Sequence, residues 1–211
     1  MKLLRDPLEA RGFEVAIFHA TGMGGMAFEV SARQGYFVAV MDFAMQELAN
    51  SMVGSVINAG SDRLTGAGSK GIPQIIAPGC SDLIDFVGWQ ETPPKYADRP
   101  FHEHNRLIKS SLLRPDERRT LIQDIVTRLQ ESKGPVNFIL PTQGVEAWDK
   151  YGEPAYDPDG LSAMVDEVRQ MIKPPLQLTE VDCHINDQAF ADTALNILDD
   201  WVATGVVQCG I

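Results

Sequence analysis

The segment Val15-Ala-Ile-Phe-His-Ala-Thr-Gly-Met-Gly-Gly25 joins an apolar, strand-like run to a run that can continue as a helix as far as Gln34. The β-branched and aromatic side chains from Val15 to Phe18 are typical of a buried strand. Glycines at such a junction let backbone N–H groups approach an anion, and the positive end of the helix dipole favours negative charge. The segment therefore predicts an α/β sheet that binds phosphate or carboxylate at the loop Thr21, Gly22, Met23, Gly24 and Gly25.

The same alternation of strands and helices continues along the chain. Strand-like runs lie at 14–19, 37–42, 73–77, 136–140 and 177–183, and helical patterns lie at 3–11, 24–34, 45–53, 61–70, 115–132, 160–172 and 188–203. Strands that alternate with helices pair in parallel through right-handed crossovers. We therefore expect residues 1–211 to form a single α/β domain, with a three-layer Rossmann-like parallel sheet and helices on both faces. Since the chain opens inside a helix, where such a domain normally opens with a strand, we expect the first edge strand to be missing.

Residues 88–111 interrupt this alternation. They contain Pro93-Pro94, Pro100 and the run Phe101-His-Glu-His-Asn-Arg106. A long irregular stretch inside a compact domain is usually functional, often as a lid, so we expect a lid-like loop here. Just before it, Ser81 and Asp82 are expected to cap the start of a helix.

Composition excludes several classes of function. The net charge is −11, from 29 acidic and 18 basic residues, and no concentrated basic face is visible, so nucleic acid is not expected as a partner. No run approaches the roughly eighteen apolar residues that a membrane span requires. The three cysteines form no C-x-x-C pair, which fits the reducing conditions of the cytoplasm. We expect a cytoplasmic protein with a small anionic ligand.

Small, glycine-rich or hydrogen-bonding residues follow nearly every predicted strand. In parallel α/β sheets, ligands lie beyond the carboxyl ends of the strands. These exits read His19-Ala-Thr-Gly22, Asp42-Phe-Ala-Met45, Ala77-Pro-Gly-Cys-Ser-Asp82, Pro141-Thr-Gln-Gly144 and Asp182-Cys-His-Ile-Asn-Asp187. We therefore expect the binding site at this edge, with Thr142, Gln143 and Gly144 as a second anion-binding loop or, alternatively, as a structural turn.

The glycine loop allows other interpretations. Gly22-Met-Gly-Gly-Met-Ala27 satisfies the dinucleotide-binding pattern, and Asp42 ends the next strand, where an acidic residue would hold ribose hydroxyls. Against NAD, His19-Ala-Thr21 separates the strand from the turn, and a tight turn without any ligand is a further alternative. The Thr21 hydroxyl could cap the helix, or it could reach a phosphate oxygen or Mg²⁺.

All four histidines fall in the suspected site: His19, His102, His104 and His184. His102 and His104, two residues apart in a strand-like segment, would direct both imidazoles to one face, which makes them weak metal candidates. No third ligand stands at a diagnostic spacing, so hydrogen bonding to a ligand or to the loop is favoured and no metal site is assigned. If Asp42, Asp182 and Asp187 join this cluster, the alternative function is a metal-assisted hydrolase or transferase acting on a phosphorylated or carboxylated small metabolite.

A family resemblance adds to this interpretation. The motifs that carry it are Phe18-His-Ala-Thr-Gly-Met-Gly-Gly25, Gln46-Glu-Leu-Ala49, Gly60-Ser-Asp-Arg-Leu64, Gly71-Ile-Pro-Gln74, Pro78-Gly79, Phe101-His-Glu-His-Asn105, Leu140-Pro-Thr-Gln-Gly-Val145, His184-Ile-Asn-Asp187 and Phe190-Ala-Asp192. In this order, from about residue 10 to 200, they resemble the UPF0261 family, the Tm-1-like ATP-binding group.

The resemblance implies two α/β domains in tandem, with ATP or another nucleotide, and possible Mg²⁺, at the cleft between them. This chain resembles the second domain, and the companion N-terminal domain is absent from it. The resemblance assigns phosphate binding to Thr21, Gly22, Gly24, Gly25 and the loop 142–144, and a polar wall to His102, His104, Asn105, His184 and Asn186. It assigns no catalytic residue. A cleft face left without its companion exposes apolar surface, so we expect a homo-oligomer.

Overall fold

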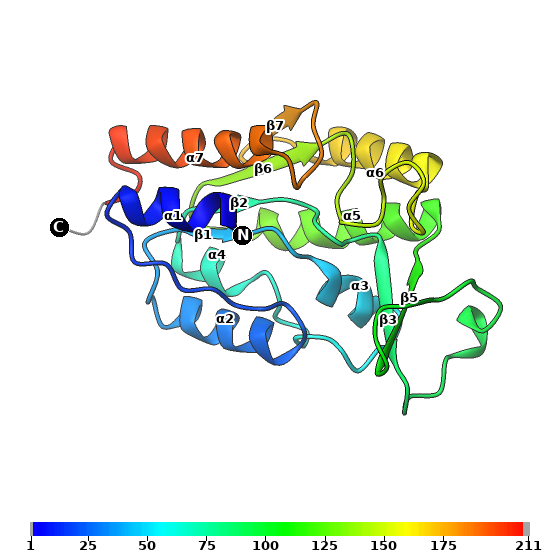
Figure 1. Cartoon of the computed structure of the whole chain (residues 1–211). Helices are drawn as coiled ribbons and strands as arrows, with labels where there is room; N and C mark the ends of the chain where they lie inside the picture. Colours follow the sequence, from blue (N-terminus) through cyan, green and yellow to red (C-terminus); the bar gives the residue numbers. More distant parts are fainter. Residues whose placement is uncertain (1, 209–211) are drawn as a thin grey trace.

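A four-stranded parallel sheet forms the middle layer of the fold, in the order β1-β2-β6-β7. Its strands are β1 (Val40–Asp42), β2 (Gln74–Ile76), β6 (Val136–Pro141) and β7 (Gln177–Val181). The structure is a computed structural model that describes residues 2–208, so Cys209 lies outside it (Figure 1). The three-layer, Rossmann-like α/β fold predicted from the sequence is confirmed.

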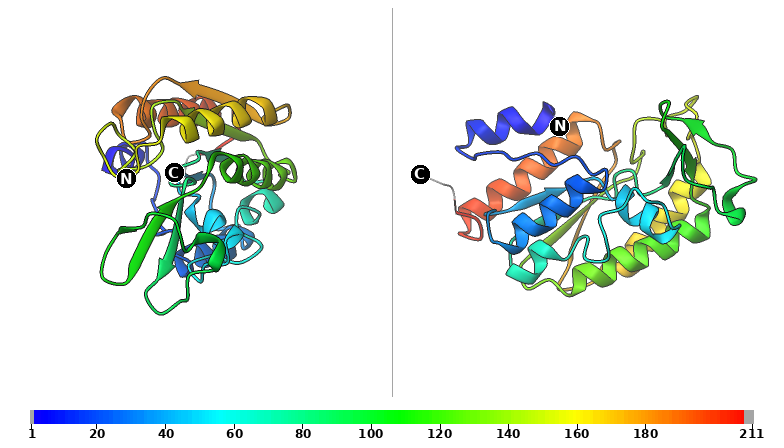
Figure 2. Two further views of the ribbon diagram at one scale, coloured as in Figure 1. Left: turned by 90° about the vertical axis from the view of Figure 1, so that its right-hand side faces the viewer. Right: turned by 90° about the horizontal axis from the view of Figure 1, so that it is seen from below.

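Helices cover both faces of this sheet (Figures 1 and 2). Alternate strand residues such as Ile76 and Phe138 face a core shared with α3 (Gln46–Met52), α5 (Pro115–Gln130) and α6 (Pro158–Met171). Ile75 and Ile139 face the opposite core, which α1 (Lys2–Ala10) and α7 (Gln188–Ala203) close. Beside β1, α2 (Met23–Arg33) packs against α4 (Gly66–Lys70). Among the described residues, no helix is long and apolar enough to cross a membrane.

The strand expected at 14–19 is absent, and that prediction is wrong. Residues 13–20 run as an extended segment beside the sheet without joining it. Among residues 2–208, no backbone or side-chain acceptor receives a hydrogen bond from the amides of residues 14–20. A strand exists only through its neighbours, so β-branched sequence alone does not make one. As a result, β1 is the edge of the sheet.

A second, antiparallel sheet in the order β3-β5-β4 occupies part of the region expected to be irregular. It consists of β3 (Leu83–Val87), β4 (His102–Glu103) and β5 (Ile108–Leu112), with the short 3₁₀ helix η1 (Pro94–Tyr96) between β3 and β4. The prediction of a helix that starts at Ser81 and Asp82 is therefore wrong, because these residues form a turn and β3 begins directly after them, at Leu83. The expected helix 61–70 is shorter than predicted, since residues 61–65 form turns and only α4 is helical.

Candidate functional site

The glycine-rich loop already holds a carboxylate that belongs to the protein. Gly22 precedes α2, and its amide donates to Glu47 Oε1 at 2.5 Å. A Cβ on Gly25 would lie 2.0 Å from Glu47 Oε2, and a Cβ on Gly24 would lie 1.9 Å from the His19 carbonyl oxygen. Close packing therefore accounts for both glycines, and the Glu47 carboxylate complements the positive end of the α2 dipole.

Three backbone amides at this loop have no hydrogen-bond acceptor among the described residues. Among residues 2–208, no acceptor receives the amides of Met23, Gly24 or Gly25, the first turn of α2. Thr21 does not cap the helix, because its hydroxyl contacts the His19 carbonyl at 3.5 Å and Gly22 occupies the N-cap position. The prediction of an anion at this loop stays a prediction, now limited to the amides of residues 23–25.

Glu47 belongs to a buried ion cluster centred on Arg63. The guanidinium donates to Glu47 at 2.7 Å, to Glu29 at 3.2 Å and to both carboxylate oxygens of Asp42, one of them at 2.9 Å. All four side chains are at most 8% exposed. Burial alone would lower the pKa of Arg63, but Asp42 and Glu47 raise it. Since both carboxylate oxygens of Asp42 accept hydrogen bonds from Arg63, this residue is not free to bind ribose hydroxyls in the way that the dinucleotide-binding pattern predicted.

The second loop, Thr142 to Gly144, also uses most of its donors internally. The amides of Thr142 and Gln143 donate to the carbonyls of Val181 and Cys183 at 3.1 and 3.0 Å. Their side chains both donate to Asp182, at 3.0 and 2.5 Å. This network ties the end of β6 to the end of β7.

Asp149 organises the rest of this loop. Its carboxylate accepts the amides of Val145 and Glu146 at 2.5 and 3.2 Å. His184 lies on the other side, with its Nε2 2.8 Å from Asp149. Because the Asn186 amide donates to Nδ1 at 3.1 Å, Nε2 carries the proton that His184 donates to Asp149. Both ring nitrogens of His184 are thus in use, which makes this histidine a structural link.

The remaining polar-wall candidates lie on the second sheet. His102 and His104 share one face, as predicted, and their rings contact Trp148 with centroids 4.9 and 5.0 Å apart. Asn105 forms the turn between β4 and β5, where its Oδ1 accepts the amides of Leu107 and Ile108 at 2.8 and 3.0 Å. Among the described residues, no group of three or more His, Cys, Asp or Glu side chains is arranged to hold a metal ion.

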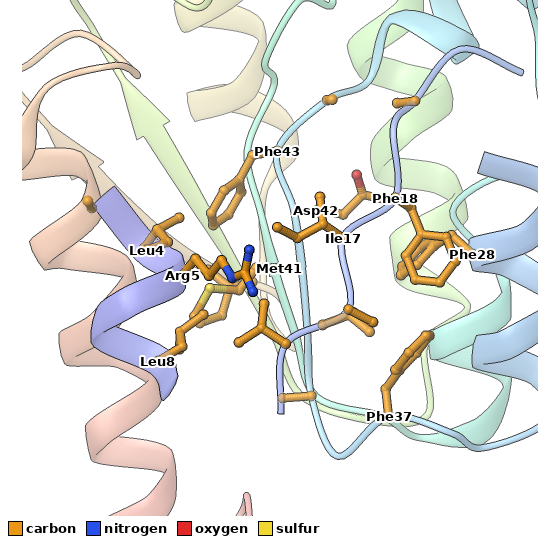
Figure 3. A pocket seen from close by; sticks show the side chains of 18 of the residues that line it. Leu4, Arg5, Leu8, Ile17, Phe18, Phe28, Phe37, Met41, Asp42 and Phe43 are labelled. Carbon is orange, nitrogen blue, oxygen red and sulfur yellow. The ribbon is translucent and has the colours of Figure 1, made fainter. Parts of the chain in front are cut away.

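A groove of about 990 Å³ reaches the glycine loop at Ala20 and Gly25 and the residues that follow the second loop, Val145 to Ala147. At the carboxyl edge of the sheet, Gly25, Glu146 and Asn186 line it, and away from this edge it runs between β1 and the extended segment 13–18 (Figure 3). Of the predicted site residues, Gly25, Asp42 and Asn186 line it. The others do not: Thr21, Gly22, Met23, Gly24, Thr142, Gln143, Gly144, His19, His102, His104, Asn105 and His184.

Glu146 is the residue in the groove that sequence reasoning missed. It is 4% exposed, and its Oε1 has no hydrogen-bond partner among the described residues. Burial raises the pKa of Glu146 to about 7, although the Trp148 amide, 2.7 Å from Oε2, counters this effect. A buried carboxyl oxygen without a partner is costly unless a ligand supplies one. The sequence does place Glu146 at the exit of β6, directly after the loop Thr142 to Gly144, and this position could have indicated a role in binding.

The comparisons with known proteins agree with one another. A family model described as "Uncharacterised protein family (UPF0261) C-terminal domain" matches residues 1–202. A UPF0261 protein of Brucella melitensis is 49% identical over 210 residues, which cover all of this chain and 50% of that protein. A UPF0261 protein of Clostridium tetani is 33% identical over 192 residues, 90% of this chain and 48% of that protein.

A plant protein is similar as well. The ToMV resistance protein Tm-1(GCR237) of Solanum lycopersicum is 30% identical over 195 residues, 92% of this chain and 26% of that protein. The chain thus spans about half the length of the bacterial relatives named above and about a quarter of the tomato protein.

Proposed function

Because this chain belongs to the UPF0261 family and matches its C-terminal domain, we propose that it is a nucleotide-binding domain, with ATP as its ligand. The ligand lies at the carboxyl edge of the parallel sheet, at the end of the groove that Gly25 and Glu146 line. A companion N-terminal α/β domain supplies the opposite wall. The reducing cytoplasm is the proposed location, where the free thiols of Cys80 and Cys183 persist.

The unpartnered Oε1 of Glu146 is the observation that carries this proposal. A ribose hydroxyl, or a Mg²⁺ ion accompanying the phosphates, would supply the donor or the positive charge that this oxygen lacks. The free amides of residues 23–25 form the first turn of α2, whose Gly25 lines the same end of the groove, and they suit phosphate oxygens. Mg²⁺ also offsets repulsion between the nucleotide and a chain of net charge −11.

A two-domain protein tests the proposal. The chain is joined to the N-terminal half of the Brucella melitensis relative, and its thermal unfolding is followed with and without Mg-ATP. At nucleotide concentrations of about 100 times Kd, we expect about 2.7 kcal/mol of added stability.

Glu146→Gln is the informative variant, since it keeps the side chain's shape and removes its charge. We expect at least about a tenfold loss of affinity for Mg-ATP, and no change for Glu153→Gln, an exposed glutamate of the same loop. If Mg-ATP leaves the unfolding temperature of the two-domain protein unchanged, nucleotide binding is excluded.

An enzymatic function is a second candidate, and the environment of Glu146 favours it. A carboxyl group whose pKa is about 7 can accept or donate a proton near neutral pH, as a hydrolase or transferase of phosphorylated metabolites requires. Release of phosphate from ATP by the two-domain protein, lost in Glu146→Gln, would identify this activity. Binding without turnover would leave the domain as a binding module.

A further inference from the structure

The edge of β1 that faces the groove carries free backbone groups. Val40 donates to the Pro73 carbonyl at 2.9 Å, and the Asp42 carbonyl accepts the Ala77 amide at 3.1 Å, so both residues face β2. Backbone groups alternate in direction along a strand, so those of Met41 face the groove. Phe43 follows the strand, and its carbonyl lies beside Gly79 instead. Among residues 2–208, nothing accepts the amide of Met41 or Phe43.

The opposite wall of the groove is a second unpaired stretch of backbone. Residues 14–18 are extended, and their amides and carbonyls form no hydrogen bond with any described residue. Their side chains suit a buried strand, yet Ile17 is 44% exposed. Two extended segments with free backbone groups thus line one groove, which is the arrangement left when a strand between them is absent.

Most side chains around the groove are apolar, both above and below the sheet, although Arg5, Asp42 and Arg63 also line it. Leu4 and Leu8 of α1 reach toward Met41 and Phe43 on one side (Figure 3). On the other side, Phe18, Phe28 and Phe37 form an aromatic cluster with centroids 5.7 to 5.9 Å apart. A strand placed here would be buried on both faces, and a nearly continuous apolar run of Val, Ile or Leu is typical of such strands.

The chain path fits a parallel strand at this place. The first turn of α1 lies toward the carboxyl ends of the sheet strands, and the helix runs back toward their amino ends (Figures 1 and 2). Residues 13–20 then run in the direction of β1 toward α2. A strand that preceded α1 would complete a β-α-β crossover whose second strand is the segment 13–18.

We propose that this groove receives one β-strand, parallel to β1, from the polypeptide that precedes α1 in the longer members of the family. About half of the Brucella melitensis relative lies outside the matched region, so such polypeptide is present in the family. The inserted strand would pair with β1 on one side and with residues 13–18 on the other. This proposal is independent of nucleotide binding, because pairing between the strands needs no ligand.

Hydrogen exchange tests this proposal directly. About ten residues that precede the matched half of the Brucella melitensis relative are fused to the N-terminus of this chain. When extended, this added segment is about 33 Å long. We expect exchange at the amides of Val15, Ile17 and Met41 to slow by at least about tenfold, without nucleotide. Unchanged exchange at both walls of the groove overturns the proposal and leaves the nucleotide proposal standing.

A pair of proline variants gives a second measurement. Met41→Pro removes an amide that faces the groove and leaves the bonds of Val40 and Asp42 to β2. Leu178→Pro is the matched control on β7, because Val181 faces β6 through its bond to Thr142 and Leu178 therefore faces away from it. We expect the stabilisation gained from the fused strand to be lost in Met41→Pro and kept in Leu178→Pro. Equal gains in both variants would contradict pairing at β1.

A second copy of the chain is the competing occupant. The open apolar groove is expected to cause self-association of the chain, and the fused strand is expected to abolish it. Size-exclusion chromatography with light scattering measures both proteins. A dimer that persists in the fused protein, with exchange at the groove unchanged, would identify the second copy as the occupant and overturn the proposal.

Discussion

The two edges of the parallel sheet, β1 and β7, differ in how they meet solvent. On β7, Gln177 and Glu180 are exposed, and Glu180 pairs with Arg169 of α6, with Nε 2.9 Å from Oε2. Charged side chains on an edge strand discourage pairing with further strands. β1 has no such protection, since Met41 and its neighbour Phe43 line an apolar groove. The difference supports the proposal that β1 receives a further strand, whereas β7 is protected as an edge.

The ion pairs at the two edges also differ, in how far they are buried. Asp42 at the end of β1 is 8% exposed and is held by buried Arg63, whereas the Arg169–Glu180 pair on β7 is 39–46% exposed. A buried guanidinium with three carboxylates fixes β1, α2, α3 and the turn before α4 relative to one another. This cluster therefore anchors the open edge of β1 to α2 and α3.

The largest expected effect comes from removing the centre of that cluster. Arg63→Ala leaves the buried carboxylates of Glu29, Asp42 and Glu47 without their cation and should lower the free energy of unfolding by about 3–5 kcal/mol. Urea denaturation measures this loss. Arg169→Ala, the matched change at β7, should shift the urea midpoint only slightly, and high salt should remove the shift. If Arg63→Ala proves too unstable to purify, Asp42→Asn keeps the shape and should still lose more than Arg169→Ala.

A smaller effect is expected where the extended segment meets α2. A Cβ at Gly24 would lie 1.9 Å from the His19 carbonyl, so Gly24→Ala should cost about 1–3 kcal/mol through overpacking. The matched control is Gly88→Ala, whose Cβ would meet only the Leu107 carbonyl, at 3.8 Å. Urea denaturation without nucleotide distinguishes them. Equal stability of the two variants would mean that Gly24 serves a ligand rather than the packing.

These contrasts show what the sequence could predict. The helix α7 was predicted with its observed bounds, because an amphipathic pattern is a local property of the chain. The strand at 14–19 was not, because a strand depends on neighbours that local sequence does not specify.

The candidate site stays a prediction, and it too depends on non-local packing. The groove reaches the glycine loop at Gly25 and the exit of β6 at Val145 and Glu146. That Glu47, more than twenty residues away, fills part of the glycine loop depends on how α3 packs, and no local pattern reveals it.

The smallest effect concerns the pH dependence of stability, which has opposite signs at Glu146, after β6, and at Glu180 on β7. Burial raises the pKa of Glu146 to about 7, from an ordinary 4.5, so the folded chain keeps a proton there that the unfolded chain releases. The stability contributed by this group is complete below about pH 4.5 and is lost as the pH rises through about 7. Arg169 lowers the pKa of Glu180 at β7, so that contribution is instead lost as the pH falls.

Glu146→Gln separates the two contributions. We expect the variant to match the parent near pH 5 and to be more stable above pH 7 by about 1–2 kcal/mol, less than the full shift implies because water screens part of it. Urea denaturation between pH 5 and 8 measures the difference, with Glu153→Gln as the control. Asp82, whose pKa burial raises to about 6, leaves some of the slope in place. A parent chain whose stability rises steadily from pH 5 to 8 would show that Glu146 is ionised at no cost. The groove beside β1 would then need no ligand at that oxygen.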